Sequence, residues 1–371
     1  MLIYFLVFAV VCALGLLSAG FRNAYVRRLC CFFAFSTLIL FGGLRWDMWT
    51  DWWQYEHFFY NTSFIENDFE IGYFLANKLI SGLGFSYTGF LLIFYLVILS
   101  ILLWCVYEYS PRFYALSLIV YCSLFFLTSG GARQHIALFV FLLSIKYIAE
   151  KRFWWFLIFL LIGSLFHRTI LLLFPIYWID KLKLNKWILI VSLVVAIILS
   201  KFNILSVLLD FVIQHTVNDG GPFIRRINFY FTQGLDGVSV GLGFLRKVLV
   251  LAMCYIIYNR SNNSRLGLYL NRLDDEYYKK LFILVKIYFM GVVLSLIIYG
   301  IFGRILTYLY FVECLLIPMV ARSVKSRYIL AFLLIILLVY TLGFVQSLGV
   351  FGRNSSTITD SLFFPYRSIF D

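Results

Sequence analysis

Long apolar runs separated by short polar segments make up most of the chain. Most runs continue for about 15–20 residues without alternation, which is typical of membrane-spanning helices, whereas strands of a membrane β-barrel alternate over about ten residues. We therefore predict an all-α, polytopic membrane helix bundle of about 12 (11–13) transmembrane helices, forming a single domain over residues 1–371. The runs cover about residues 1–19, 29–44, 87–107, 114–128, 133–149, 153–166, 169–179, 187–201, 244–258, 281–299, 304–320 and 328–345.

Two longer segments lie between the runs, at about residues 45–86 and 202–243. Apolar positions recur at helical spacing within each of them, in FEIGYFLANKLISGLGF (69–85) and in NILSVLLDFVIQHTV (203–217). Such stretches are typical of amphipathic helices that lie along the membrane interface. We expect both segments on the extracytoplasmic side.

The stretch from Phe153 to Ile179 has two interpretations. It fits one long tilted helix with His167 near its middle, or two shorter arms that meet at His167 and Arg168. The sequence DKLKLNK (180–186) follows and carries three lysines. Lysines favour a cytoplasmic position and therefore two arms, because a single helix would reverse the orientation of every later helix.

The composition excludes a soluble protein, because 63% of the residues are hydrophobic and only 13% are charged, against about 25% charged residues in soluble domains. The net charge of +13 does not indicate nucleic acid as a partner, because cytoplasmic loops of membrane proteins collect Lys and Arg. Placing the basic loops inside puts both termini outside. Arg22, Arg27 and Arg28 follow the first apolar run, so we expect that run to be a first helix and not a signal peptide.

The cysteines and histidines indicate neither disulfides nor a metal site. All seven cysteines lie in apolar runs, and no CxxC motif or Cys/His cluster occurs, so they are typical of small core residues. The four histidines lack the spacing of metal ligands, and no nucleotide-binding loop is present. We therefore expect neither a metal nor another cofactor.

The sequence RWDMWTDWWQY (45–55) combines an arginine, two aspartates and four tryptophans directly after an apolar run. On a helix, Asp47, Asp51 and Tyr55 would share one face. Aromatic rings that stack on sugars, with carboxylates that accept from hydroxyl groups, predict a carbohydrate surface. An aromatic belt at the membrane interface is the alternative. The nearby FEIGY sequence adds two candidates for the same surface, Glu70 and Tyr73.

Three further sites interrupt apolar runs with charge, which marks functional candidates in a membrane protein. In TSGGARQH, Arg133 and Gln134 begin a helix after a glycine turn, which suits either a phosphate clamp or contact with lipid headgroups. In LFHRT, His167 with Arg168 is either a core histidine or a general base.

In GRILTYLYFVE (303–313), Arg304 begins a helix and Tyr308 lies one turn later. Arg304 suits a second phosphate contact, while Glu313, deeper in the run, fits a pair with an arginine. Arg246 and Lys247 fit either a positive entrance to the site or contacts with lipid headgroups.

The order of these motifs resembles the EpsG-like group of bacterial exopolysaccharide and O-antigen polymerases of the Wzy type. The similar pieces extend over almost the whole chain: R-x-D-x(3)-D-x(3)-Y at 45–55, ExGY at 70–73, ARQxIA at 132–137, FHRT at 166–169, the helix that begins at Arg304, and FPYRSIF at 364–370. The chain departs from the group at Trp46 and Met48, where glycine is common, and at Arg168-Thr169, where Ser-Ala is common.

The resemblance implies a membrane glycosyltransferase that moves a glycan from undecaprenyl diphosphate to the nonreducing-end hydroxyl of a new lipid-linked repeat unit. It implies an active site on the extracytoplasmic face of the bacterial inner membrane, and as partners the lipid-linked donor and acceptor, the bilayer, a chain-length regulator and a flippase. A lipid-linked oligosaccharide flippase, a glycan ligase and a noncatalytic assembly subunit remain as alternatives.

We expect the candidate residues to divide into three roles under this resemblance. His167 would act as the catalytic base, with Asp51 as a rival. Arginines can stabilise the departing diphosphate without a metal, and the candidates are Arg133, Arg304, Arg45 and Arg168. The residues expected to bind sugar are Asp47, Tyr55, Glu70, Tyr73, Gln134 and Tyr308.

Overall fold

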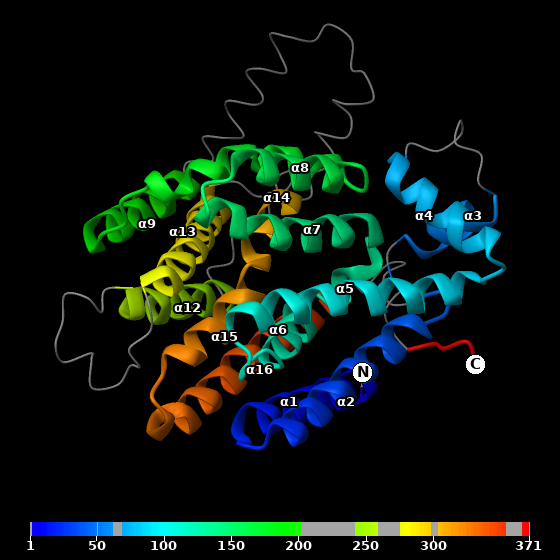
Figure 1. Cartoon of the computed structure of the whole chain (residues 1–371), viewed down its shortest axis with the longest axis horizontal. Helices are drawn as coiled ribbons and strands as arrows, with labels where there is room; N and C mark the ends of the chain where they lie inside the picture. The colour runs from blue at the N-terminus through cyan, green and yellow to red at the C-terminus, as the bar shows by residue number, and fades with distance from the viewer. Residues whose placement is uncertain are drawn as a thin grey trace, which may run out of the picture.

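The structure is a computed structural model that describes residues 2–49, 51–61, 69–201, 242–258, 275–297, 303–353 and 366–370. Within these ranges every regular element is a helix, which confirms the predicted all-α fold (Figure 1). A single bridge of β type joins Arg45 to Ser368. The expected amphipathic helix at 203–217 lies outside the described residues.

Seven spans in the described part of the chain are long and apolar enough to cross a membrane. They are formed by α1 (Leu2–Gly20), α2 (Ala24–Gly43), α5 (Tyr87–Tyr109), α7 (Ala132–Ala149), α13 (Asp275–Ile297), α14 with α15 (Gly303–Phe311 and Glu313–Ser323), and η5 with α16 (Ser326–Tyr328 and Ile329–Arg353). The other predicted runs hold shorter elements: α6 (Leu116–Leu124), α8 (Phe153–Ser164), the 3₁₀-helix η2 (Arg168–Lys181), α9 (Lys186–Lys201) and α12 (Leu242–Tyr258). Every predicted run therefore contains a helix, while the number of about twelve crossings stays a prediction.

Helices α6, α7, α13 and α15 form the interior of the bundle. Every residue from Leu116 to Ser123 in α6 is buried, as are most residues of α13 and α15. Helix α6 is apolar on all sides, as expected for a helix that other helices surround. The peripheral helices α1, α8 and α16 instead leave large apolar side chains exposed, which suits contact with hydrocarbon.

The His167 region consists of two arms, which decides between the two interpretations of the sequence. Helix α8 ends at Ser164, His167 is extended, and η2 begins at Arg168. The arms run antiparallel, since the ring of Phe153 at the start of α8 contacts that of Tyr177 near the end of η2 (centroids 5.1 Å apart). A 3₁₀-helix rises about 2.0 Å per residue, so η2 extends over roughly 28 Å, close to the hydrocarbon thickness of a membrane. The 3₁₀ geometry thus lets a short apolar run extend across most of the hydrocarbon layer.

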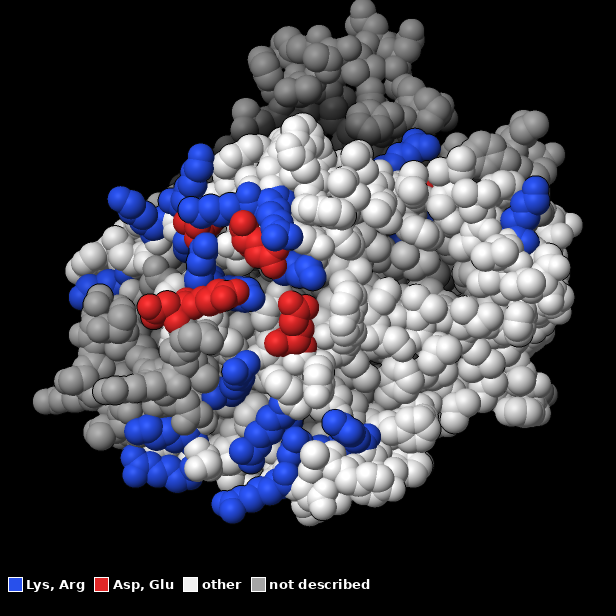
Figure 2. Space-filling model, viewed as in Figure 1, with Lys and Arg blue, Asp and Glu red and all other residues white. Residues whose placement is uncertain are grey.

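Three elements direct their C-terminal ends toward one end of the bundle, where basic side chains cover their last carbonyl groups. The pairs are Arg322 on the carbonyl of Tyr109 (α5, 2.5 Å), Lys279 on that of Ala149 (α7, 2.8 Å) and Lys286 on that of Asp180 (η2, 2.7 Å). Cations stabilise helix C-termini because these carry partial negative charge. Figure 2 shows Lys and Arg gathered on the side where α13 begins and α15 ends. We refer to this side as the basic end.

The described residues between Arg45 and Asp51 are not helical, so the prediction that Asp47, Asp51 and Tyr55 share one helix face is wrong. Asp47, Trp49 and Asp51 have positive φ angles of 44°, 71° and 66°. Helix α3 (Trp52–Tyr60) begins only after them. Non-glycine residues adopt such angles only where the surrounding structure imposes them.

The C-terminal residues supply that surrounding structure. The backbone N–H of Trp46 donates to the carbonyl of Arg367 (3.1 Å), and that of Ile369 donates to the carbonyl of Leu44 (3.0 Å). The Arg367 guanidinium also pairs with Asp47 at 3.3 Å. Contacts with a segment more than 300 residues away in the sequence therefore override the local helical spacing of the tryptophan-rich stretch.

A buried ion pair joins three helices inside the bundle. Arg246 in α12 donates to Glu313 at the start of α15 (2.5 Å), and the Tyr340 hydroxyl of α16 donates to the same carboxylate oxygen. Glu313 is fully buried and Arg246 nearly so. This position excludes Arg246 as an exposed headgroup contact and confirms that Glu313 pairs with an arginine.

We expect single substitutions in this pair to destabilise the fold more than the double substitution. Arg246→Met or Glu313→Leu alone leaves one buried charge without its partner, which costs about 3–5 kcal/mol. The double variant removes both charges and should unfold at a higher temperature than either single variant. Thermal unfolding of the detergent-purified chain measures this order. A double variant no more stable than Glu313→Leu would contradict it.

Candidate functional site

The Glu70 carboxylate lies at the centre of a polar cluster at the end of the bundle opposite the basic end. Glu70 precedes α4 (Ile71–Gly82). One of its oxygens accepts from Arg133 of α7 at 2.7 Å. The other lies 3.4 Å from the backbone nitrogen of Arg168 and 3.5 Å from Nδ1 of His167. The carboxylate side chain is only 9% exposed, so these partners balance a charge that solvent hardly reaches.

Three helix N-termini converge around this cluster. Helix α7 begins at Ala132, after the 3₁₀ turn η1 (Leu127–Gly130), as the glycines of TSGGARQH predicted. The 3₁₀-helix η2 begins at Arg168. Helix α14 is joined to α7 at its first turn, because the Gln134 side chain donates to the carbonyl of Arg304 (3.0 Å). Helix N-termini present unpaired N–H groups and partial positive charge, so this arrangement favours an anionic ligand.

His167 has one ring nitrogen directed at Glu70 and the other available. Its side chain is 9% exposed, and the 3.5 Å from Nδ1 to the carboxylate is at the long limit of a hydrogen bond. In the described chain neither ring nitrogen forms a hydrogen bond of good geometry, and Nδ1 is buried beside the Glu70 carboxylate. A carboxylate beside Nδ1 favours the tautomer with Nδ1–H and leaves Nε2 as the acceptor, as in a general base with its orienting acid.

Arg133 keeps part of its hydrogen-bonding capacity for a ligand. One terminal nitrogen donates to Glu70, and Nε donates to the Tyr55 hydroxyl at 3.2 Å. Its guanidinium also lies over the Phe69 ring, 4.3 Å from the centroid. A guanidinium has five N–H groups, and the side chain is 21% exposed. Its remaining N–H groups can therefore bind an anion from a position that Glu70, Tyr55 and Phe69 hold in place.

The surroundings of Glu70 favour its charged form. Burial raises the pKa of the carboxyl group, but the hydrogen bond from His167 and the positive charge of Arg133 outweigh burial and hold the pKa at about 2. Glu70 is therefore an ion-pair partner and not a proton donor near neutral pH.

Buried hydroxyl groups border the cluster. Thr169 at the start of η2 and Tyr308 of α14 each have an oxygen that is buried without a hydrogen-bond partner of good geometry within the described chain. The two residues interact with each other, and Tyr308 lies within electrostatic range of Glu70 and Arg304. The Tyr73 hydroxyl is likewise buried and unpaired, beside Tyr55 (ring centroids 5.3 Å). Unsatisfied buried polar atoms are uncommon and suit a ligand that supplies the missing partners.

The structure brings together most of the predicted site residues and separates three of them. Arg45 is buried in an aromatic cage, 4.4 Å from the Trp49 ring centroid, and donates to the Tyr95 hydroxyl at 2.6 Å. Asp47 pairs with Arg367, and Asp51 is exposed at the start of α3. None of these three contacts Glu70, Arg133 or His167 in the described part of the chain, so the geometry gives them no direct part in the cluster.

The sequence alone did not identify two residues that contribute to the cluster. Thr169 was treated only as part of the FHRT motif, and Gly72 only as part of ExGY. The Gly72 N–H donates to the carbonyl of Leu165 at 2.7 Å, just before the His167 turn. A Cβ at Gly72 would lie 2.7 Å from that oxygen. The glycine thus permits the close approach that places Glu70 beside His167, and the ExGY spacing was the available signal.

Comparison with known protein families identifies the chain. The model of the EpsG family matches residues 28–368, which include every residue of the Glu70 cluster. The chain belongs to the EpsG family. No curated protein and no solved structure matches it. Membership in the EpsG family, together with the seven candidate spans, indicates a multi-pass membrane protein of the polysaccharide polymerase type, as the sequence resemblance predicted.

We expect opposite effects from alanine at two glycines of α4 in this EpsG-family chain. Gly72→Ala forces the helix away from Leu165 and should cost about 1–3 kcal/mol. Gly82→Ala meets no atom within 4 Å and should be neutral or stabilise by up to about 1 kcal/mol, because alanine favours the helix. Thermal unfolding of both purified variants tests the difference, and equal midpoints would contradict the close approach at Gly72.

The ion pair of Glu70 predicts a pH dependence of stability. Its folded-state pKa of about 2 lies below the ordinary value of 4.5, so its contribution is present above pH 4.5 and is lost as the pH falls toward 2. We expect wild type to lose about 3 kcal/mol more than Glu70→Gln between pH 6 and pH 2. Glu276→Gln, which removes a 73% exposed carboxylate, is the control and should follow wild type. If wild type and Glu70→Gln lost the same free energy of unfolding between pH 6 and pH 2, the lowered pKa of Glu70 would be refuted.

Proposed function

We propose that this chain polymerises lipid-linked oligosaccharide repeat units on the extracytoplasmic face of the bacterial cytoplasmic membrane. The growing glycan is transferred from undecaprenyl diphosphate to the nonreducing-end hydroxyl of a new lipid-linked unit. The observation that carries this proposal is the convergence of three helix N-termini, Arg133 and the Glu70–His167 pair at the end of the bundle opposite the basic end.

The anionic leaving group suits the cationic half of the cluster. When the bond between the anomeric carbon and the diphosphate oxygen breaks, the electron pair remains on the diphosphate and increases its negative charge. Fixed N–H groups and guanidinium groups stabilise such charge without rearranging during the reaction. Arg133 carries this role, with exposed Arg168 and Arg304 at the first turns of η2 and α14 as further contacts. This chemistry requires no metal.

The Glu70–His167 pair suits the nucleophile. The acceptor hydroxyl forms the new bond to the anomeric carbon and transfers its proton to Nε2 of His167. Glu70 then stabilises the resulting imidazolium and keeps the ring oriented. In this proposal Glu70 positions His167, whereas the sequence predicted that Glu70 binds sugar. We assign the hydroxyl groups of Tyr308, Thr169 and Tyr73, which border the cluster, to the binding of sugar hydroxyls of the acceptor.

The experiment is deletion of the gene, complementation with variants, and electrophoresis of the surface glycans. We expect the deletion strain to accumulate lipid carrying one repeat unit and to lose the ladder of longer glycans. Wild type should restore the ladder. His167→Ala and Arg133→Ala should each reduce polymer by at least about 100-fold, the usual contribution of a general base or a charge-stabilising group.

His57→Ala and Arg152→Ala are the matched controls. His57 is exposed in α3 at the same end of the bundle, and the Arg152 side chain is 62% exposed at the basic end. Both variants should give full ladders. Lipid-linked units trapped on the cytoplasmic side would favour a flippase, and long polymer that is not transferred to its final carrier would favour a ligase. A full ladder with His167→Ala at normal protein levels would refute its role as base.

A further inference from the structure

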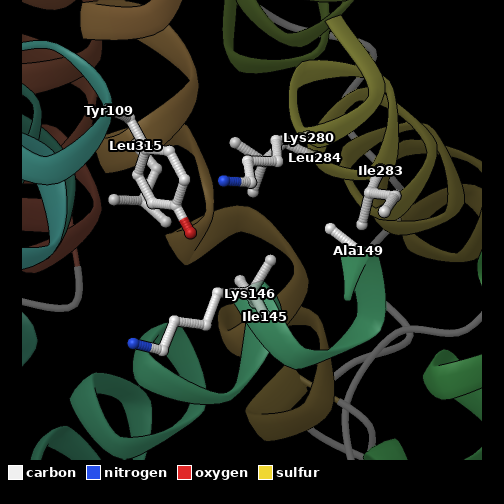
Figure 3. Close-up of a pocket in the computed structure, with 8 residues that line it drawn as sticks. All are labelled: Tyr109, Ile145, Lys146, Ala149, Lys280, Ile283, Leu284 and Leu315. Atoms are coloured by element: carbon white, nitrogen blue, oxygen red, sulfur yellow. The ribbon is translucent and has the colours of Figure 1, made fainter. Parts of the chain in front are cut away.

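A second polar site lies at the basic end, where Lys146 is about 20 Å along α7 from Arg133, since an α-helix rises about 1.5 Å per residue. A pocket opens there between α5, α7, α13 and α15 (Figure 3). Lys146, Lys280 and the Tyr109 hydroxyl form its polar part, and Figure 3 shows the hydroxyl group between the two lysine side chains. The Glu70 cluster uses none of these residues.

The two lysines differ from the other cations nearby, which already bind helix ends. Arg322 and Lys279 donate to the last carbonyl groups of α5 and α7. Lys146 contacts only the rings of Trp104 and Tyr147 and forms no ion pair within the described chain. Its ammonium group therefore retains its N–H donors for a ligand.

Lys280 can exchange its present partner. It pairs at 2.8 Å with Glu276, one turn earlier on α13, and the Glu276 side chain is 73% exposed. Exposed pairs of this kind contribute little to stability. A phosphate group that approached Lys280 and Lys146 together would gain two cations, while Glu276 would return to solvent.

The remaining wall of the pocket is apolar, and an exposed tryptophan lies beside the pocket. Ile145, Ala149, Leu284 and Leu315 line it. Trp104, over which Lys146 lies, is 59% exposed near the end of α5. Exposed tryptophans gather where the hydrocarbon of a membrane meets the headgroups. An amphiphile with an acidic head can therefore place its head at the two lysines and its apolar chains on the surface beside Trp104.

We propose that this pocket binds an anionic phospholipid through its phosphate group. Lys146, Lys280 and the Tyr109 hydroxyl hold the phosphate at the mouth of the pocket, and the acyl chains lie along the exposed apolar surface beside Trp104. Basic pockets between membrane helices on the cytoplasmic side are suited to such headgroups. The site is independent of the glycan chemistry at the other end of α7.

Native mass spectrometry of the purified full chain tests this site. The chain is offered equal amounts of phosphatidylglycerol and phosphatidylcholine in detergent. We expect wild type to retain phosphatidylglycerol preferentially. Lys146→Gln/Lys280→Gln should bind it about tenfold more weakly, because each lysine near a membrane surface contributes to binding an anionic lipid. Excess glycerol phosphate should not displace the lipid, because it lacks acyl chains.

The matched control is Lys151→Gln/Lys183→Gln, which removes two exposed lysines from the basic end. It should bind phosphatidylglycerol as wild type does. Three results would each overturn the proposal. Both double variants could bind phosphatidylglycerol equally weakly, the pocket variant could bind it as wild type does, or glycerol phosphate could displace it. Thermal unfolding without added lipid confirms that the pocket variant folds. If it does not, Lys146→Gln alone, at a half-exposed position, should bind about threefold more weakly.

Discussion

The need to balance one buried carboxylate governs the arrangement of the site. Glu70 is almost hidden from solvent, and a carboxylate in that position requires charged or N–H partners. Its partners come from α7 and from the turn before η2. Three segments far apart in the sequence are therefore held together by one charge. Gly72 permits the close approach, and the result leaves Nε2 of His167 and part of the Arg133 guanidinium available for a ligand.

The direction of the helices gives the two ends of the bundle opposite partial charges. The N-termini of α7, η2 and α14 meet at the Glu70 cluster, where their partial positive charge favours an anion. The C-termini of α7 and η2 meet basic side chains at the opposite end, where Lys279 and Lys286 cover the carbonyl groups. The same helices thus favour an anion at one end and present a lysine-rich surface at the other. The 3₁₀ form of η2 makes this possible with a short apolar run.

Sequence patterns located the charged interruptions correctly and misjudged some of their partners. Arg133, Arg168 and Arg304 lie at helix starts as predicted, since glycine and charge end apolar runs wherever the chain folds locally. Glu70 pairs with Arg133, a contact that the sequence did not predict, while its role in sugar binding stays a prediction. The helical face of Asp47 and Asp51 does not exist, because the C-terminal residues pair with the backbone beside Arg45 and impose positive φ angles.

The sequence by itself determined the all-α membrane class, the positions of the helices, the basic end and the residues that carry charge into apolar surroundings. These properties follow from hydrophobic run length and from the cost of charge in hydrocarbon, both of which are local. Only the tertiary structure decided that the His167 region is a hairpin, that Glu70 lies beside His167, and that Arg45 is enclosed by aromatic rings. Those outcomes depend on which distant segments share a low-dielectric interior, where every buried charge selects its partners by position and not by spacing along the chain.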